Sequence, residues 1–340
     1  MTMHNSDPSI QPSIQIDAKA LFLVWGAPHG SRRSQIIAQH LGMDVKHIYI
    51  TAKKGKYHAL YKYPYQFFAT LIFLIRTRYQ LVFIQDPPIF AALPVYIYSL
   101  FFPAKFIIDA HTPPLLHPMW KWTLPLHRFL SRRAITTLVT NDYLRDLVMD
   151  WGAHSLVLED PPLAPRVTEP LALPANRLNV VMVSSASPDE PVREVLKAAR
   201  ELPEIHFYIT GDYSGARQPI VDSAPENAHF TGYLQEDFFS LLEAADVMMD
   251  LCVEDYQFLS GANEALWLGK PLITSQGPVL ETYFNQGTLH IDNTAPGIRE
   301  ALLEMQDDLP RFRAEMRALQ TIRRQEWWEK ARQLLTVVQK

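Results

Sequence analysis

Short apolar runs alternate with amphipathic segments along most of the chain. A strand that helices cover on both faces is apolar throughout, so these runs predict buried strands of parallel sheets. In the first half they lie at residues 20–25, 45–50, 81–85, 105–109 and 136–140. The second half repeats the pattern at residues 180–184, 206–210, 229–234, 247–251 and 272–273. Two series of alternating strands and helices predict an α/β protein with two doubly wound parallel-sheet domains.

A proline-rich stretch without periodicity separates the two series, at residues 159–174, and it predicts a domain linker. The expected organisation has five parts. They are a flexible tail at residues 1–19, a first domain at 20–165, a linker at 166–176, a second domain at 177–310 and a terminal helix at 311–340.

The composition is that of a globular protein, with 48% hydrophobic and 20% charged residues among 340. Cys252 is the single cysteine, which excludes an intramolecular disulfide and a cysteine-based metal site. The polar N-terminal segment lacks the basic-then-apolar order of a signal peptide. These features predict a cytoplasmic protein.

Charge is distributed unevenly between the halves. Residues 1–165 contain 16 Lys and Arg against 10 Asp and Glu, whereas residues 166–340 contain 16 against 26. A basic first half is expected to meet an anionic partner, either a membrane surface, a lipid-linked phosphate or a nucleic acid. The overall charge of −4 makes nucleic acid the least favoured of the three.

A basic and aromatic stretch at residues 53–68 precedes an apolar helix at residues 69–75. This helix is too short to span a bilayer, which needs about 20 residues. Basic and aromatic side chains around a short apolar helix favour contact with a membrane surface. The sequence therefore predicts a protein peripheral to the inner face of the membrane.

Two predicted helix starts carry donors for an anion, because the first N–H groups of a helix have no partner within it. The first comprises Gly30, Ser31, Arg32 and Arg33, and predicts a phosphate or acceptor site. The second comprises Gly261, Ala262 and Asn263, and predicts a diphosphate site. Glu264 is expected in the first turn of the second helix, where its carboxylate can bridge two ribose hydroxyls. Gly211 and Asp212, after another strand, allow close approach of a nucleotide.

Residues 264–272 resemble the donor-nucleotide segment of GT-B glycosyltransferases of the family 4 type. In that family a glutamate precedes an A-x-x-x-G-K-P run, which corresponds here to Glu264, Ala265 and residues 269–271. The family's second glutamate, eight positions earlier, is replaced by Tyr256, and Glu254 or Asp255 could substitute for it. The resemblance implies two Rossmann-like domains facing a cleft, with a C-terminal helix that crosses back to the first domain. Trp327 and Trp328 would anchor that helix.

The segments IQDPPIFAALPV and FIIDAHT are similar to parts of the chitobiosyldiphosphodolichol β-mannosyltransferase family. That family is membrane-associated and uses GDP-mannose with a lipid-diphosphate-linked acceptor. The resemblance assigns the catalytic region to His111 and Asp109, at the end of a strand. His111 could donate to the leaving phosphate oxygen or move a proton, and Asp109 could orient it or act as a base.

The resemblance also implies which residues contact the donor around the second sheet. Tyr233 would flank the base, and the loop holding Ser185 would contact the diphosphate, with Arg193 as its nearest cation. The Arg and Lys that usually clamp the diphosphate in this loop are missing. Asp189 and Glu190 could hold a metal there, but acids at a helix start more often cap it, so no metal is expected.

These features together predict a glycosyltransferase that uses a GDP- or UDP-sugar donor, without a tightly bound metal. Its acceptor would be a polyprenyl-diphosphate-linked saccharide or another saccharide hydroxyl. Two alternatives stay open: a nucleotide-sugar 2-epimerase, and a non-catalytic relative that binds a membrane or a partner. The sequence fixes neither the sugar and base of the donor, nor the acceptor, nor the stereochemical outcome.

Overall fold

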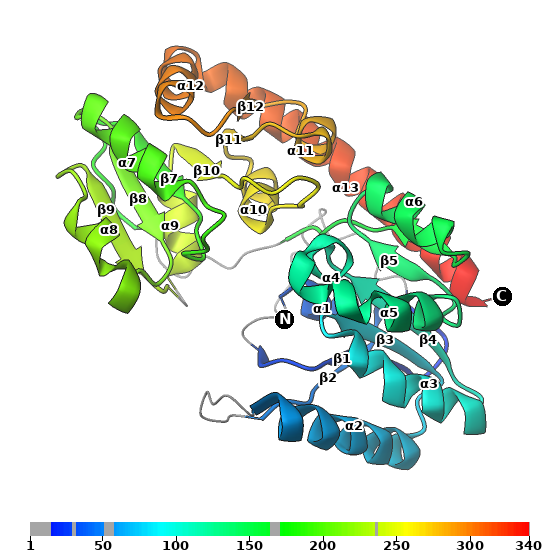
Figure 1. The fold of residues 1–340 in the computed structure, drawn as a ribbon. Coiled ribbons are helices and arrows are strands. Elements are labelled where there is room, and N and C mark those ends of the chain that lie inside the picture. Colours follow the sequence, from blue (N-terminus) through cyan, green and yellow to red (C-terminus); the bar gives the residue numbers. More distant parts are fainter. Residues whose placement is uncertain (1–14, 29–31, 51–57, 164–170, 235–236, 340) are drawn as a thin grey trace, which may run out of the picture. The chain divides into compact units, whose positions relative to one another are not determined.

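The computed structural model describes residues 15–28, 32–50, 58–163, 171–234 and 237–339 (Figure 1). The chain divides into two compact units. The first comprises residues 1–161 together with 327–340, and the second comprises residues 162–326. Each unit is built on its own six-stranded sheet with every pairing parallel.

The first sheet has the strand order β2-β1-β3-β4-β5-β6. Its strands are β1 (Ala20–Val24), β2 (Asp44–His47), β3 (Leu81–Asp86), β4 (Lys105–Ala110), β5 (Thr137–Val139) and β6 (Ser155–Val157). The connecting helices are α1 (Arg32–Leu41), α2 (His58–Thr77), η2 (Ile89–Ala91), α3 (Ala92–Phe101), α4 (Thr112–Leu116), η3 (Pro118–Thr123), α5 (Leu124–Ser131) and α6 (Asp142–Asp150). The strand order reverses between β1 and β3.

The second sheet has the order β12-β11-β10-β7-β8-β9. Its strands are β7 (Asn179–Met182), β8 (His206–Thr210), β9 (Ala228–Gly232), β10 (Val247–Asp250), β11 (Leu272–Ser275) and β12 (Thr288–Ile291). The helices are α7 (Val192–Glu201), η4 (Gly215–Arg217), α8 (Gln218–Asp222), α9 (Phe238–Ala244), α10 (Ser260–Leu268), α11 (Pro278–Tyr283), α12 (Ala295–Asp307) and α13 (Leu309–Gln339). Here the order reverses between β7 and β10, which is where ligands bind in open α/β sheets.

Alternate residues of each central strand enter different cores, because both faces of each sheet are covered by helices. In β1, Leu21 and Leu23 pack with side chains of α2, α3 and α6, whereas Phe22 and Val24 pack with α1. In β10, Val247 and Met249 face α7 and α12. Met248 packs with α9 and α10 on the opposite face. This double coverage explains why the strands are uniformly apolar in sequence.

The last helix, α13, belongs to both units, as expected of a helix that crosses back. Its final turns bury Trp327 and Trp328 against α1 and the first sheet. Trp327 Nε1 donates to the carbonyl of Glu159 at 3.1 Å, and Lys330 forms an ion pair with the Glu159 carboxylate. The two tryptophans therefore anchor this end of the helix in the first unit.

Several boundaries differ from the sequence-based ones. The second compact unit begins at Pro162 and extends to Glu326, so most of α13 belongs to it. Residues of the expected N-terminal tail are held in place, since the Ile16 N–H donates to Leu41 O at 3.2 Å. The strand expected at 45–50 is the shorter β2, and the helix expected at 69–75 is the 20-residue α2. Within the described residues, we find no helix with the length and apolar character needed to cross a membrane.

Candidate functional site

The helix α10 begins where the second sheet reverses its strand order, next to the end of β10. The last residue of β10, Asp250, lies directly beneath the helix start. Its Oδ2 accepts a hydrogen bond from the Ala262 N–H at 3.0 Å, and the Gly261 N–H also donates to its carboxyl group. A Cβ on Gly261 would lie 2.6 Å from Asp250 Oδ2, so only glycine allows this approach. The start of α10 is thus occupied by a carboxyl group of the chain itself.

Gly261, Ala262 and Asn263, the predicted diphosphate site, thus have acceptors within the chain, and their contact with a diphosphate stays a prediction. The Asn263 N–H donates to Leu259 O at 3.1 Å, and its side-chain oxygen accepts from Trp267 Nε1 at 3.0 Å. A buried N–H group costs free energy when it lacks an acceptor, and here each of the three has one within the chain. A bound anion would have to displace the Asp250 carboxylate to use the first two.

Glu264 lies in the second turn of α10 rather than in the first turn as predicted, and it is buried. The helix ends with Gly269 in the left-handed conformation at φ 65°. Lys270, the cation of the G-K-P run, donates to the carbonyls of Glu243 and Ala245, at the end of α9. Burial lowers the pKa of Lys270. It therefore caps another helix instead of contributing charge to the α10 start.

The loop after β7 folds around the carboxylate of Glu190. The Ser185 N–H and Oγ donate to Glu190 Oε1 at 2.9 and 2.8 Å, and the Ser187 N–H donates to Oε2 at 3.2 Å. The Ser184 hydroxyl donates to Oε2 as well. Four donors converging on one carboxylate form the kind of arrangement that binds a phosphate. Both hydrogen-bond donors of Ser185, a predicted diphosphate contact, thus bind the Glu190 carboxylate.

Asp250 lies in the field of two further acids, Glu190 and Asp189. Burial, and then the charges of Glu190 and Asp189, raise the pKa of the Asp250 carboxyl, whereas the N–H groups of Ala262 and Gly261 lower it. The net result is a pKa of about 7. Burial also raises the pKa of the Cys252 thiol to about 12, and this thiol donates to Asp189. Among the described residues, no group of His, Cys, Asp and Glu side chains has the geometry to hold a metal ion.

The other predicted donor contacts lie on neighbouring strand ends of the same sheet. Gly211 has a φ of 101°, and a Cβ there would lie 2.6 Å from Ser184 O, so the glycine permits close packing of two loops. Asp212 follows it and accepts from the Ser214 N–H at 3.0 Å. Hydrogen bonds from the Ser214 side chain and from this N–H lower the pKa of Asp212. Tyr233 is 66% exposed after β9, and Arg193 is exposed in the first turn of α7. These residues, the α10 start and the Ser185 loop therefore share one edge of the second sheet.

In the first unit, Arg33 and Asp109 form a buried ion pair. Arg33 Nε and Nη2 donate to the Asp109 carboxylate at 2.8 to 3.2 Å, Nη1 donates to Asp160 at 2.8 Å, and Nη2 also donates to Leu158 O at 2.8 Å. Arg33 is 8% exposed and Asp109 is 1% exposed. The predicted phosphate role of Arg33 stays a prediction, and its guanidinium is engaged in this network. The same guanidinium engages the Asp109 carboxylate, which is the predicted base.

His111 follows β4 and precedes the first turn of α4. Its Nε2 lies 4.0 Å from Asp109 Oδ2, beyond hydrogen-bonding distance, and has no hydrogen-bond partner among the described residues. The ring is 31% exposed. Asp109 thus lies beside His111 without orienting it through a hydrogen bond. The predicted phosphate residues Gly30 and Ser31 lie outside the described residues, and Arg32 is exposed at the start of α1.

Sequence reasoning missed the roles of Asp250, Glu190 and Asp160 in these networks. It also missed a buried pair in the first unit, in which His127 Nε2 lies 2.7 Å from Asp86 Oδ2. A clue existed for Asp250, which is an acid at the end of the apolar run VMMD and so comes to the ligand-binding edge of the sheet. Nothing in the spacing connected Arg33 to Asp160, which lies 127 positions later.

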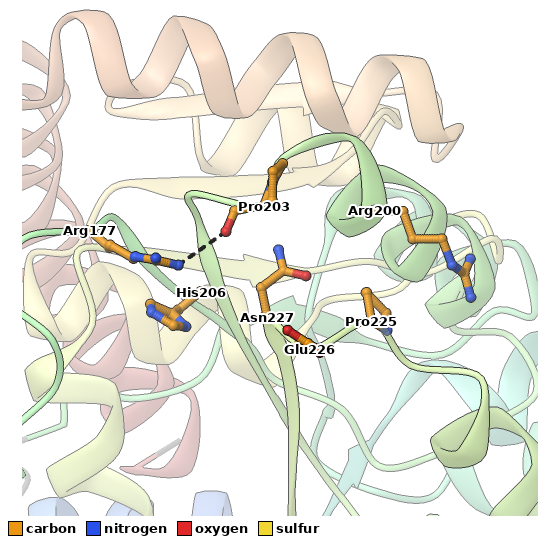
Figure 2. Close-up of a pocket in the computed structure, with 7 residues that line it drawn as sticks. All are labelled: Arg177, Arg200, Pro203, His206, Pro225, Glu226 and Asn227. Atoms are coloured by element: carbon orange, nitrogen blue, oxygen red, sulfur yellow. Dashed lines mark hydrogen bonds between the residues drawn. The ribbon is translucent and has the colours of Figure 1, made fainter.

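A cavity of about 590 Å³ lies at the opposite, amino edge of the second sheet (Figure 2). Arg177 on its wall donates to Pro203 O at 3.1 Å, and the pKa of His206 is lowered by burial and by Arg177 and His229. The lining contains none of the predicted site residues; it consists of Arg177, Arg200, Pro203, His206, Pro225, Glu226 and Asn227. This cavity is therefore separate from the strand ends at which the candidate donor contacts meet.

No protein-family model matches the chain, and no curated protein sequence matches it. Solved structures do resemble it. HepE of Anabaena, in complex with UDP and glucose, has 15% identity and a TM-score of 0.70, covering 95% of this chain and 100% of its own. Sucrose-phosphate synthase of Thermosynechococcus elongatus has 13% identity and a TM-score of 0.73, with 94% and 98% covered. A UDP-N-acetylglucosamine 2-epimerase homologue of Listeria monocytogenes has 10% identity and a TM-score of 0.63, with 88% and 91% covered.

At these identities the likeness concerns the fold. The chain has the GT-B fold, in which two Rossmann-like units with parallel sheets are joined by a C-terminal helix shared between them.

Proposed function

We propose that this protein is a nucleotide-sugar-dependent glycosyltransferase. The observation that supports it most is the edge of the second sheet where the strand order reverses between β7 and β10. The Ser185 loop, Gly211, Tyr233 and the start of α10 with Glu264 all belong to that edge. Ligands bind at such reversal points, and HepE, which shares the fold, was solved with UDP and glucose.

The donor diphosphate would take the place of carboxylates already bound there. Asp250 and Glu190 accept from the N–H and O–H groups that a diphosphate would need. Protonation of Asp250, whose pKa is about 7, removes one negative charge from the edge when a nucleotide arrives. Arg193 is the exposed cation nearest in sequence to this loop. Glu264 would bridge the ribose hydroxyls, as the resemblance of its segment implies.

The reaction would be attack of an acceptor hydroxyl on the anomeric carbon of the donor. A bond forms between the hydroxyl oxygen and that carbon, and the bond to the diphosphate oxygen breaks. The hydroxyl proton passes to a base or to the leaving phosphate oxygen. The resemblance gives His111 the role of proton carrier, and its buried Nε2 has no hydrogen-bond partner among the described residues. The ion pair between Asp109 and Arg33 fixes the end of β4 next to His111.

The proposed acceptor is a saccharide, including one linked to a polyprenyl diphosphate, and the proposed location is the inner membrane surface. Donor turnover tests the proposal. Purified protein would be incubated with UDP- and GDP-sugars, with and without lipid-linked saccharides, and release of nucleoside diphosphate would be followed. We expect release that needs an acceptor and is lost in Glu264→Gln, with Glu300→Gln on the exposed side of α12 as the matched control. Glu264→Gln turnover equal to that of the wild type would reject the donor-site assignment.

A second candidate is a non-catalytic relative, and one observation favours it. The donors around the α10 start and the Ser185 loop are already satisfied within the chain. The Ser185 loop also lacks the Arg and Lys that usually clamp the diphosphate in the resembled family, which favours the same hypothesis. Failure to bind any nucleoside diphosphate would support this reading. Conversion of a donor to its 2-epimer without any acceptor would instead favour the epimerase reading, for which the Listeria structure offers a fold precedent.

A further inference from the structure

The exposed positions of helix α2 carry no charged side chain over four turns. Between residues 61 and 75, every exposed position is apolar or aromatic, and we call these residues the α2 face: Tyr61, Pro64, Tyr65, Phe68, Ile72 and Ile75. Phe68 is 60% exposed and Tyr65 is 56% exposed. A contiguous apolar surface of this kind marks an interaction site.

The buried side of the same helix already packs an apolar core, through Leu74, and it also holds two polar residues. Gln66 and Thr70 are fully buried. Gln66 Nε2 donates to Ile48 O at 2.6 Å, and Thr70 Oγ1 accepts from Trp25 Nε1 at 2.9 Å. A surface helix of a globular domain normally presents polar residues outward, whereas α2 presents apolar ones on that side too. The placement of apolar residues outward therefore serves something other than the packing of this unit.

Exposed apolar side chains continue beyond α2 on both flanks. The Arg78 guanidinium, just after α2, lies 4.1 Å from the Phe102 ring, which brings the ends of α2 and α3 together. There, Phe101 is 77% exposed. On the other flank the Phe90 ring lies 5.2 Å from Tyr63 of α2 and 5.6 Å from Trp122, which is 70% exposed. Figure 1 shows α2 alongside α3 in this unit.

Most of the charge around this surface is positive, with the exposed Asp44, which accepts from the Tyr79 hydroxyl, as an acid beside it. From Val45 to Asn141 the sequence contains twelve Lys and Arg residues and only two acids, Asp86 and Asp109. Both acids are buried, Asp86 against His127 and Asp109 against Arg33. Along this stretch the described surface thus shows cations without acids. An apolar face with aromatic residues and surrounding cations is typical of a segment bound to an anionic lipid surface.

We propose that the α2 face inserts into the headgroup region of an anionic bilayer, with the helix axis along the membrane plane. Arg76 and Arg78 at the end of the helix then meet lipid phosphates, and the aromatic rings occupy the interfacial layer. A second copy of the chain is the less suitable occupant, because it would bring like charges together. The proposal adds to the proposed glycosyltransferase the face by which its first unit meets the lipid, and it does not depend on the donor site.

Flotation of the full chain with vesicles tests the proposal. Vesicles of phosphatidylcholine with phosphatidylglycerol are compared with vesicles of phosphatidylcholine alone. We expect binding to the anionic vesicles that weakens as salt is raised, and that falls at least about tenfold in the double variant Phe68→Glu/Ile72→Glu. Leu303→Glu, at a 40% exposed position of α12, is the matched control and should bind as the wild type does. Because all three positions are exposed, circular dichroism and Tm should stay unchanged.

A labelled cysteine locates the contact directly. The one native cysteine, Cys252, is buried, so Ile72→Cys and Leu303→Cys each offer one accessible thiol for an environment-sensitive fluorophore. Anionic vesicles should shift the emission to the blue at position 72 and leave position 303 unchanged. Absence of vesicle binding, or binding that Phe68→Glu/Ile72→Glu leaves intact, would overturn the proposal. So would a wild-type dimer in light scattering that the double variant converts to a monomer. Nucleotide binding measured without vesicles separates this outcome from failure of the donor site.

Discussion

The Asp250 carboxylate accepts a hydrogen bond from the Ala262 N–H at 3.0 Å, at the start of helix α10. A helix N-terminus attracts anions through its unpaired N–H groups and its dipole, and here the anion is part of the protein. In the loop after β7, the Glu190 carboxylate likewise accepts hydrogen bonds from backbone N–H groups, those of Ser185 and Ser187. The two carboxylates hold the ligand-binding edge of the second sheet in shape, and they also oppose a diphosphate that would use the same donors.

The stability of the protein should depend on the protonation of Asp250. Its pKa is raised from 3.8 to about 7, so the folded state binds a proton that the unfolded state has released between these values. Stability from this group is therefore full below about pH 4 and is lost as the pH rises to about 7, by at most about 4 kcal/mol. Asp250→Asn stays neutral and can still accept from the two N–H groups. We expect its Tm to exceed that of the wild type at pH 8 and to approach it at pH 5.

The exposed Asp255→Asn provides the control for this comparison, since it should shift Tm equally little at both pH values. Thermal unfolding at pH 5, 6, 7 and 8 measures the difference. An Asp250→Asn variant whose Tm difference from the wild type is the same at every pH would show that Asp250 does not titrate in this range.

Removing the charge of Glu190 should strengthen nucleotide binding. In Glu190→Gln the loop keeps a side chain that accepts hydrogen bonds, but the repulsion between a carboxylate and the incoming diphosphate is gone. We expect the affinity for the preferred nucleoside diphosphate to rise by about threefold to tenfold in calorimetry. Glu201→Gln, at the far end of α7, should leave the affinity unchanged. Weaker binding in Glu190→Gln would mean that the carboxylate organises the loop for the ligand instead of competing with it.

The Arg33–Asp109 pair should be structural. Arg33→Met leaves the Asp109 carboxylate buried without a counter-ion, and we expect a loss of about 3–5 kcal/mol of unfolding free energy. The double variant Arg33→Met/Asp109→Leu should regain much of that loss, since it leaves no buried charge at the pair. Urea unfolding measures both variants. Arg145→Met, in an exposed ion pair with Asp142, should change stability by less than about 1 kcal/mol. A tolerated Arg33→Met would instead favour the predicted phosphate role of Arg33.

Much of the fold could be predicted from local pattern. The strand at His206–Thr210 has the predicted bounds, because an apolar run depends on neighbours in sequence. The end of α10 at Gly269 was also predictable locally, because glycine adopts the left-handed conformation that follows the last turn of a helix. Helix α2 was only partly predicted, since its outward face is apolar as well as its inward face, so it lacks the usual amphipathic pattern.

The candidate site was less predictable, because it depends on which side chains meet after folding. Residue types and strand ends placed the donor contacts on one edge of the second sheet. They could not reveal that Asp250 and Glu190 would satisfy the donors there, or that Asp109 would pair with Arg33 across 76 positions of sequence. A donor in a sequence pattern is available to a ligand only if no acceptor of the protein reaches it.

Calorimetric titration of the purified protein with UDP, GDP, ADP and dTDP decides whether the second unit holds a nucleotide-sugar donor site, with Glu264→Gln measured beside the wild type and Glu300→Gln as the control. We expect one nucleotide to bind more tightly than the others, Glu264→Gln to lose this binding, and Glu300→Gln to keep it. Absence of binding by all four, in a protein that is folded by circular dichroism, would contradict the donor site and leave the non-catalytic reading.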